Sequence, residues 1–180
     1  MPILDKKQKS LSAVARESLA AKVDKRILGI DPGYARAGWA VLENQGQKLK
    51  LIKFGCVETS AKLSHAERLK KLNLELEKII KKHKPDTLAI EELFFFKNLK
   101  TAIKVAESRG VALLTAIDAK LEIHEYTPLQ IKQALVGYGR AEKNQIGQMV
   151  KIILSLKEIP KPDDITDAIA VTITCAHSIK

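Results

Sequence analysis

The chain has 180 residues, a formal net charge of +10 and a pI of about 9.6. Its content of 46% hydrophobic and 29% charged residues is typical of a folded globular domain and excludes a wholly disordered chain. No apolar run is long enough to span a bilayer, and the basic charge indicates an anionic partner, either nucleic acid or an anionic membrane surface.

Residues 1–25 are predicted to form a basic extension outside the core, with six basic and three acidic residues. Apolar residues recur there at steps of three or four, which indicates an amphipathic helix, and a disordered basic arm is the alternative. The main domain is expected over 26–180. The chain shows no secretory signal, and Cys56 and Cys175 lie in apolar stretches without metal-ligand spacing, so we expect buried thiols and a cytoplasmic protein.

The main domain opens with a predicted antiparallel meander of three strands. Residues 26–31 (RILGID) are a short apolar run that ends in an Asp-Pro-Gly turn. A second strand is expected over 37–42, and a turn at 44–46 leads to a third over 48–57, where Leu and Lys alternate.

Helices and strands then alternate. A capping box at Ser64 and Glu67 begins a basic amphipathic helix over 64–84, and a buried strand follows over 86–91. Further elements are expected as a helix at about 97–119, a strand at 121–126, and helices at about 128–136, 142–156 and 164–178. The order predicts an α/β fold, a mixed five-stranded sheet flanked on both faces by helices.

Carboxylates stand at the ends of several of these elements. Asp31 ends the first strand and Glu91 ends the fourth, whereas Asp164 and Asp167 lie three apart on one face of the last helix. A buried strand rarely carries a carboxylate unless a cation or metal accompanies it. Singly, each acid has a structural explanation, such as a turn at Asp31 or a helix cap at Asp163 or Asp164. Because these element ends share one sheet edge, we expect the acids to converge.

Converging carboxylates predict a metal site. Their mutual repulsion requires cations, and hard oxygen ligands select Mg²⁺ or Mn²⁺. Two such ions about 4 Å apart can activate water and stabilise the leaving oxygen of a phosphodiester. An acidic pocket in a basic chain therefore predicts a metal-dependent nuclease.

Four segments, found over about residues 26–178, resemble the RuvC family of Holliday-junction resolvases. They read ILGIDPGYARAGWAV, AIEELFFFKN, EYTPLQIKQALVGYGRAEKNQI and DDITDAIAVTITCAH. The resemblance implies a ribonuclease-H-like fold, with Asp31, Glu91, Asp164 and Asp167 as catalytic ligands of two Mg²⁺ ions, for which Mn²⁺ would substitute. Glu91 is preferred over Glu92, which in a strand would point to the opposite face.

The resemblance also marks residues outside the acids. Phe94, in the run 94–96, is expected to engage junction bases, since an aromatic face stacks on unpaired bases; core packing is the alternative for some of the three. Lys132 and Lys143 are expected to act catalytically at the scissile phosphate, and Arg140 to contact DNA, the alternative being solvated surface residues. The helix at 97–119 has an apolar face that fits either the core or a homodimer, and a close neighbour is expected at Gly110.

The leading hypothesis is a homodimeric endonuclease that resolves Holliday junctions during recombination and repair. Metal-dependent nicks in two opposed strands would leave 5′-phosphate ends, and a RuvAB-type branch-migration complex is the expected partner. A related nuclease acting on RNA–DNA hybrids or flaps is one alternative. A junction-binding module without chemistry is another.

Overall fold

The computed structural model describes residues 25–46, 48–93 and 99–179. The predictions for the N-terminal extension and for Phe94, Phe95 and Phe96 lie outside these residues. Within the described part of the chain, no helix is both long and apolar enough to cross a membrane.

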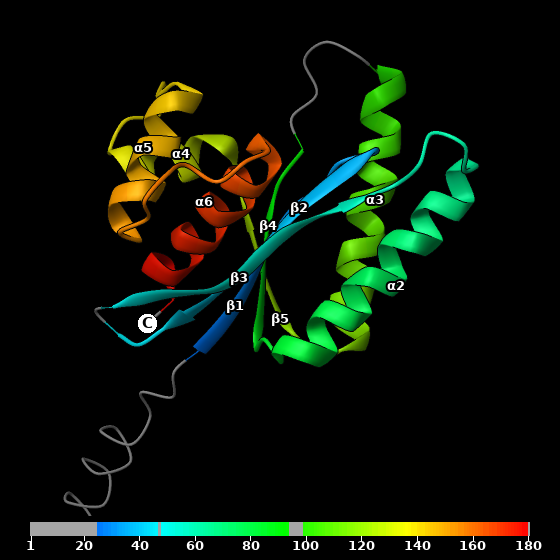
Figure 1. The fold of residues 1–180 in the computed structure, drawn as a ribbon, viewed down its shortest axis with the longest axis horizontal. Helices are drawn as coiled ribbons and strands as arrows, with labels where there is room; N and C mark the ends of the chain where they lie inside the picture. Colours follow the sequence, from blue (N-terminus) through cyan, green and yellow to red (C-terminus); the bar gives the residue numbers. More distant parts are fainter. Residues whose placement is uncertain (1–24, 47, 94–98, 180) are drawn as a thin grey trace, which may run out of the picture.

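The centre of the fold is a five-stranded sheet in the order β3-β2-β1-β4-β5 (Figure 1). The first three strands, β1 (Lys25–Asp31), β2 (Arg36–Asn44) and β3 (Leu49–Glu58), form the predicted antiparallel meander. Parallel pairing then adds β4 (Thr87–Glu91) beside β1 and β5 (Glu122–Tyr126) beside β4. The mixed sheet expected from the sequence is confirmed.

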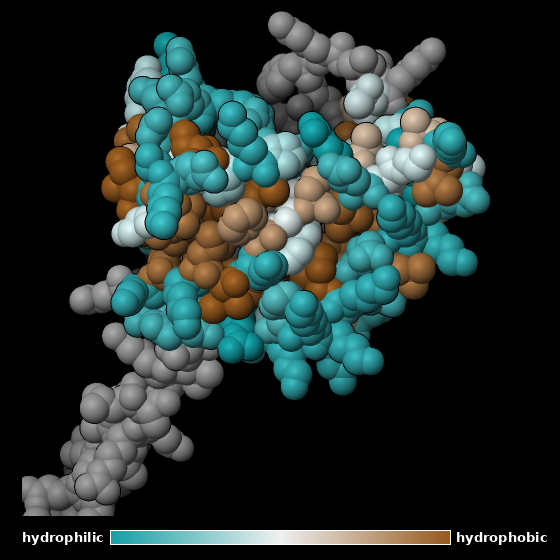
Figure 2. Space-filling view, in the orientation of Figure 1, coloured by the Kyte–Doolittle hydropathy of each residue, from teal (hydrophilic) through white to brown (hydrophobic). Residues whose placement is uncertain are grey.

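Two helices, α2 (His65–His83) and α3 (Leu99–Asp118), cover one face of the sheet. The predicted capping box begins α2: the Glu67 amide donates to the Ser64 hydroxyl, and the Glu67 carboxylate accepts from the Ser64 amide. The buried side of α2 packs against the strands through Leu72, Leu76 and Ile79. The outward side of α2 is hydrophilic (Figure 2), as expected of a basic amphipathic helix.

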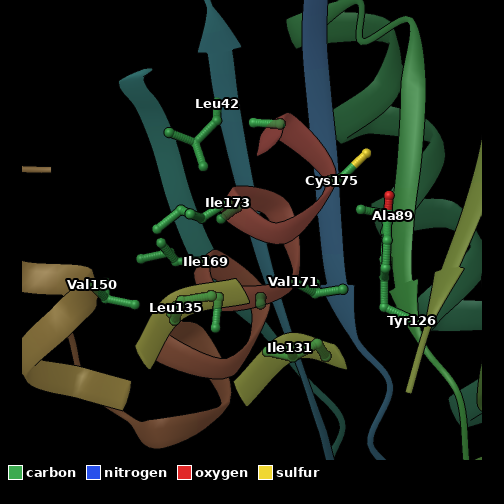
Figure 3. Packing of buried hydrophobic residues seen from close by; sticks show 14 of the residues in the cluster. Leu42, Ala89, Tyr126, Ile131, Leu135, Val150, Ile169, Val171, Ile173 and Cys175 are labelled. Atoms are coloured by element: carbon green, nitrogen blue, oxygen red, sulfur yellow. The ribbon is translucent and has the colours of Figure 1, made fainter. Parts of the chain in front are cut away.

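The opposite face is covered by α6 (Asp163–Ser178), with α4 (Pro128–Val136) and α5 (Lys143–Ile153) packed outside it. Figure 3 shows Ile169 and Ile173 of α6 among apolar side chains of the sheet, α4 and α5. Gly29 of β1 permits this close packing, because a Cβ atom there would collide with Thr172 and with the Ala168 carbonyl oxygen. The middle of α6 is therefore held against β1, the central strand of the sheet.

One local prediction was wrong, one structural alternative is excluded, and one expectation is not met within a single chain. The helix predicted over about 142–156, which is α5, ends at Ile153, because Ser155 takes a left-handed conformation with φ of 51°. Pro162 is the N-cap residue of α6, so neither Asp163 nor Asp164 caps that helix. Gly110 has open space where a Cβ atom would lie, so no neighbour within the described chain approaches it closely.

Candidate active site

The strands and the last helix bring the predicted acids to one edge of the sheet. β1 and β4 are parallel, and Ile30 pairs with Ile90, so Asp31 and Glu91 follow at the same level. The N-terminal turns of α6 carry Asp164 and Asp167 to that edge (Figure 1, where α6 is orange at its start).

Gly38 of β2 explains how α6 comes so near. A Cβ atom at this position would collide with the Asp164 carbonyl oxygen. Gly38 also pairs with Asp31 across the β1–β2 ladder. The absent side chain thus allows the first turn of α6 to lie directly above the end of β1.

The acids interact strongly with one another. Burial and the charges of Asp167, Glu91 and Asp164 raise the pKa of Asp31 from 3.8 to about 7. Burial and the charge of Asp167 raise the pKa of Glu91 from 4.5 to about 7. The pKa of Asp167 is also raised, chiefly by burial. The carboxylates form one electrostatic cluster that is short of positive charge.

Asp164 meets a cation that the sequence analysis missed. Arg36 Nη2, at the start of β2, lies 3.3 Å from Asp164 Oδ2. The two groups form an ion pair without a hydrogen bond. Asp164 Oδ2 is buried and has no hydrogen-bond partner among the described residues. Asp164 Oδ2 therefore has an ion-pair contact with Arg36 and an unused hydrogen-bond acceptor.

Lys132 and Lys143 lie beside two of the acids. A cavity of about 330 Å³ is lined by Glu91, Asp167 and both lysines, with Pro128, Ile131, Ile146 and Ala170 completing its wall. Lys143 Nζ donates to Asp167 Oδ2 over 3.1 Å, and the carboxylates raise the pKa of Lys143. The charge of Lys143 lowers the pKa values of Asp31 and Glu91, and that of Lys132 lowers the pKa of Glu91.

Arg109 of α3 anchors the end of β4 and was also missed. Its Nε donates to the backbone carbonyl of Glu91 over 3.1 Å, and its Nη2 forms an ion pair with Glu125 of β5. An arginine within the largely apolar pattern of a helix was the only available signal. Arg109 thus fixes the strand end from which Glu91 projects.

The other predicted residues are less closely tied to the cluster. Arg140 is exposed after the end of α4 and forms no ion pair with any described residue. Glu92 is half-buried, and its backbone N–H donates to the Tyr126 carbonyl oxygen over 2.8 Å. Phe94 lies outside the described residues.

The donor set fits a hard divalent cation. Carboxylate oxygens are the ligands that Mg²⁺ and Mn²⁺ prefer. The pKa of Asp31 stays raised despite the charge of Lys143, and Asp164 Oδ2 has no hydrogen-bond partner among the described residues. The side chains are not already set at ligand distances: among the described residues, no three acidic, histidine or cysteine groups are arranged to hold an ion. Cation binding would therefore require side-chain rearrangement within the cluster.

The family model described as crossover junction endodeoxyribonuclease RuvC matches residues 27–175. A protein of that name from Halothermothrix orenii is 51% identical, over 86% of this chain and 93% of its own. That from Heliobacterium modesticaldum is 54% identical, over 85% of this chain and 94% of its own.

A solved structure extends the comparison to the fold. Thermus thermophilus RuvC in complex with Holliday junction substrate matches with a TM-score of 0.79 and 34% identity, over 83% of this chain and 92% of that chain. The ribonuclease-H-like fold implied by the sequence is thereby confirmed. On the matched residues, the identity and the shared fold, the chain belongs to the RuvC family of crossover junction endodeoxyribonucleases.

Proposed function

We propose that the protein resolves Holliday junctions by hydrolysing one phosphodiester bond in each of two opposed strands. The observation that carries this proposal is the cluster of Asp31, Glu91 and Asp167 beside Lys132 and Lys143 at one sheet edge. The family assignment supports the same activity, and the Thermus relative is described in complex with a Holliday junction.

The family is metal-dependent, and we assign the metal ligands to Asp31, Glu91, Asp164 and Asp167. Two Mg²⁺ ions, or Mn²⁺ in their place, would supply an activated water and stabilise the leaving oxygen. The chain itself supplies the acid cluster and the wall of the cavity beside it. Hydrolysis at this site would leave a 5′-phosphate end.

Cationic and aromatic residues would bind and position the DNA. Lys143 and Lys132 would hold the scissile phosphate and stabilise the negative charge that develops on it. Arg140, which is exposed and three residues before Lys143, would contact another phosphate. Phe94 would engage unpaired bases at the junction centre.

A homodimer would place two such sites on one junction. The outer side of α3 supports this arrangement: Ile103, Leu114 and Ile117 are each 60% exposed, and they share one helix face with the open position of Gly110. An apolar stripe of this kind is typical of an interface, and two-fold symmetry suits two opposed strands. A RuvAB-type motor remains the proposed partner.

We also place the activity in the cytoplasm, as the sequence predicts. Cys56 and Cys175 are both free thiols. Cys175 is fully buried in the apolar core around α6, where it packs as a small hydrophobic residue.

The test is incubation of the full chain with a synthetic mobile four-way junction, with Mg²⁺ or with chelator. Paired symmetric nicks that disappear with chelator are expected, with far slower cutting of plain duplex and of RNA–DNA hybrid. Asp31→Asn should bind the junction normally but cut it at least about 10³-fold more slowly. Junctions left uncut by the wild-type protein in both Mg²⁺ and Mn²⁺ would contradict the proposal.

A further inference from the structure

A groove of adjoining cavities continues from the active site toward β3. The catalytic cavity shares Lys143 and Asp167 with a second cavity of about 370 Å³, whose wall includes Asn144, Asp163 and Lys161. Lys161 and Ile159 are shared in turn with a third cavity of about 700 Å³. The three cavities therefore form one path along the segment between α5 and α6 (orange in Figure 1).

The far end of this path is positively charged. The third cavity is lined by Lys151, Lys157 and Lys161 against a single acid, Glu158. None of the three lysines forms an ion pair with a residue in the described ranges, in contrast to Lys143. Phe54 of β3, which is 39% exposed, provides an apolar side.

We propose that Lys151, Lys157 and Lys161 bind the phosphate backbone of a duplex arm that leaves the cleavage site. Continuity with the cavity of the catalytic acids makes DNA the occupant, and uncompensated lysines complement a phosphodiester chain. The inference rests on the proposed function, because it takes its ligand from the junction substrate. It places a binding surface well beyond the residues that touch the scissile phosphate.

Junction binding in chelator tests the groove through its dependence on salt. Removing one phosphate-binding lysine should reduce the slope of log K against log salt by about 0.9. The variant Lys151→Gln/Lys157→Gln/Lys161→Gln should therefore reduce that slope by about 2 to 3 and bind about 10- to 100-fold more weakly at moderate salt. At saturating enzyme it should cut within about twofold of the wild-type rate, since it retains the acids, Lys132 and Lys143.

The control variant, Lys70→Gln/Lys71→Gln/Lys81→Gln, removes the same charge from exposed positions on α2, on the other face of the sheet. It should keep the wild-type slope. If the groove variant kept the wild-type slope of log K against log salt, the proposed binding of DNA by the three lysines would be overturned. If the groove variant had a smaller slope than the wild type but the wild type cut no junction, the proposed function would be overturned and the binding groove would stand.

A second, independent observation concerns Tyr34, in the turn between β1 and β2. The Arg68 guanidinium lies 4.5 Å from the centre of the Tyr34 ring, and Lys104 Nζ lies 4.5 Å from it as well. Arg68, of α2, is only 8% exposed, and it donates to a backbone carbonyl rather than to a carboxylate. The His65 ring lies 5.4 Å from Tyr34 and is bonded to Glu107 of α3. Side chains of α2 and α3 thus contact the same aromatic ring.

The turn at residues 32–35, which carries Tyr34, joins two parts of the acid cluster. Asp31 directly precedes it, and Arg36, which pairs with Asp164, directly follows it. Thr59, directly after β3, also contacts this turn, and its amide donates to the Ala35 carbonyl oxygen over 2.9 Å. We infer that Tyr34 is a positioning residue, which sets Asp31 and Arg36 through the cation–π contacts of its ring.

Tyr34→Leu removes these contacts, whereas Tyr34→Phe keeps an aromatic face and is the matched control. Tyr34→Leu should lower kcat for junction cutting about 10- to 100-fold and require more Mg²⁺, while junction Kd in chelator and the circular dichroism spectrum stay unchanged. Tyr34→Phe should restore kcat to within about threefold of wild type. Wild-type cutting by Tyr34→Leu, or an equal decrease in both variants, would overturn the inference.

Discussion

Lys143 Nζ lies 3.1 Å from Asp167 Oδ2, and the two residues come from different helices, α5 and α6. Lys143 is the cation that most directly offsets the cluster, because its charge opposes the raised pKa values of Asp31, Glu91 and Asp167. The contact therefore places an ammonium group among the carboxylates, in the cavity to which we assign the scissile phosphate.

Replacing this lysine tests its role. Lys143→Gln should slow junction cutting by about 10²-fold, the usual effect of removing one donor to developing charge. It should also raise the pKa values of Asp31 and Glu91 further, so the acidic limb of the rate profile moves to higher pH. Single-turnover cutting measured from pH 5 to about 9 gives both results. Lys71→Gln, on the exposed side of α2, is the control, and an unshifted profile in Lys143→Gln would contradict this role.

The acid cluster should make metal-free stability depend on pH. With folded pKa values of about 7 for Asp31 and Glu91, the folded state binds more protons than the unfolded state between their ordinary values of 3.8 and 4.5 and neutral pH. Stability due to these groups is therefore greatest at low pH and is lost as pH rises through 7.

Thermal unfolding in chelator, scanned from pH 5 to about 8, should show this fall. Asp31→Asn should flatten it and stabilise the metal-free protein at pH 8 by about 1 to 3 kcal/mol. Mg²⁺ should raise the Tm of wild type more at pH 8 than at pH 6, because it binds the ionised acids. A Tm of the wild type in chelator that does not fall between pH 6 and pH 8 would exclude this electrostatic strain.

Local sequence patterns predict the elements that carry the acids better than the contacts that hold them. The apolar run ending at Asp31 and the capping box at Ser64 depend on neighbouring residues, and both were predicted correctly. The pairing of Arg36 with Asp164 joins residues far apart in the chain, and it depends on how closely α6 approaches β2. No local pattern carries that information, so Arg36 and Arg109 were missed whereas Lys132 and Lys143 were found through family resemblance.

The Arg36–Asp164 pair should matter more for cutting than for stability. Arg36 is half-exposed, so its ion pair contributes at most about 1 kcal/mol to folding. Arg36→Gln would leave the Asp164 carboxylate without its nearest cation, which should raise the Mg²⁺ needed for half-maximal cutting and slow cutting about 3- to 10-fold at limiting metal. Arg36→Lys should recover part of this activity. The measurement is a Mg²⁺ titration of junction cutting by the wild type, Arg36→Gln and Arg36→Lys. Identical titration curves would show that Arg36 has no role in cutting.

The close approach of β2 to α6 gives a further prediction. Gly38→Ala places a methyl group against the Asp164 backbone, and the first turn of α6 must shift to relieve the collision. We expect destabilisation by about 1 to 3 kcal/mol and cutting reduced by more than about 10-fold, because Asp164 and Asp167 move together. Cutting should be measured well below the Tm and normalised to folded protein. Full activity per folded molecule would show that the acids tolerate the shift.

The apolar stripe on α3 predicts how the protein associates. Leu114→Glu places a charge at the centre of the exposed face shared by Ile103 and Ile117, and should convert a dimer into a monomer in sedimentation velocity. Since one subunit then nicks each junction, single nicks should replace coordinated paired nicks, while cutting by each active site is largely retained. Leu74→Glu is the matched control, because Leu74 is 44% exposed on α2 and lies off the stripe. A Leu114→Glu protein that still sediments as a dimer and still makes paired nicks would place the subunit interface elsewhere.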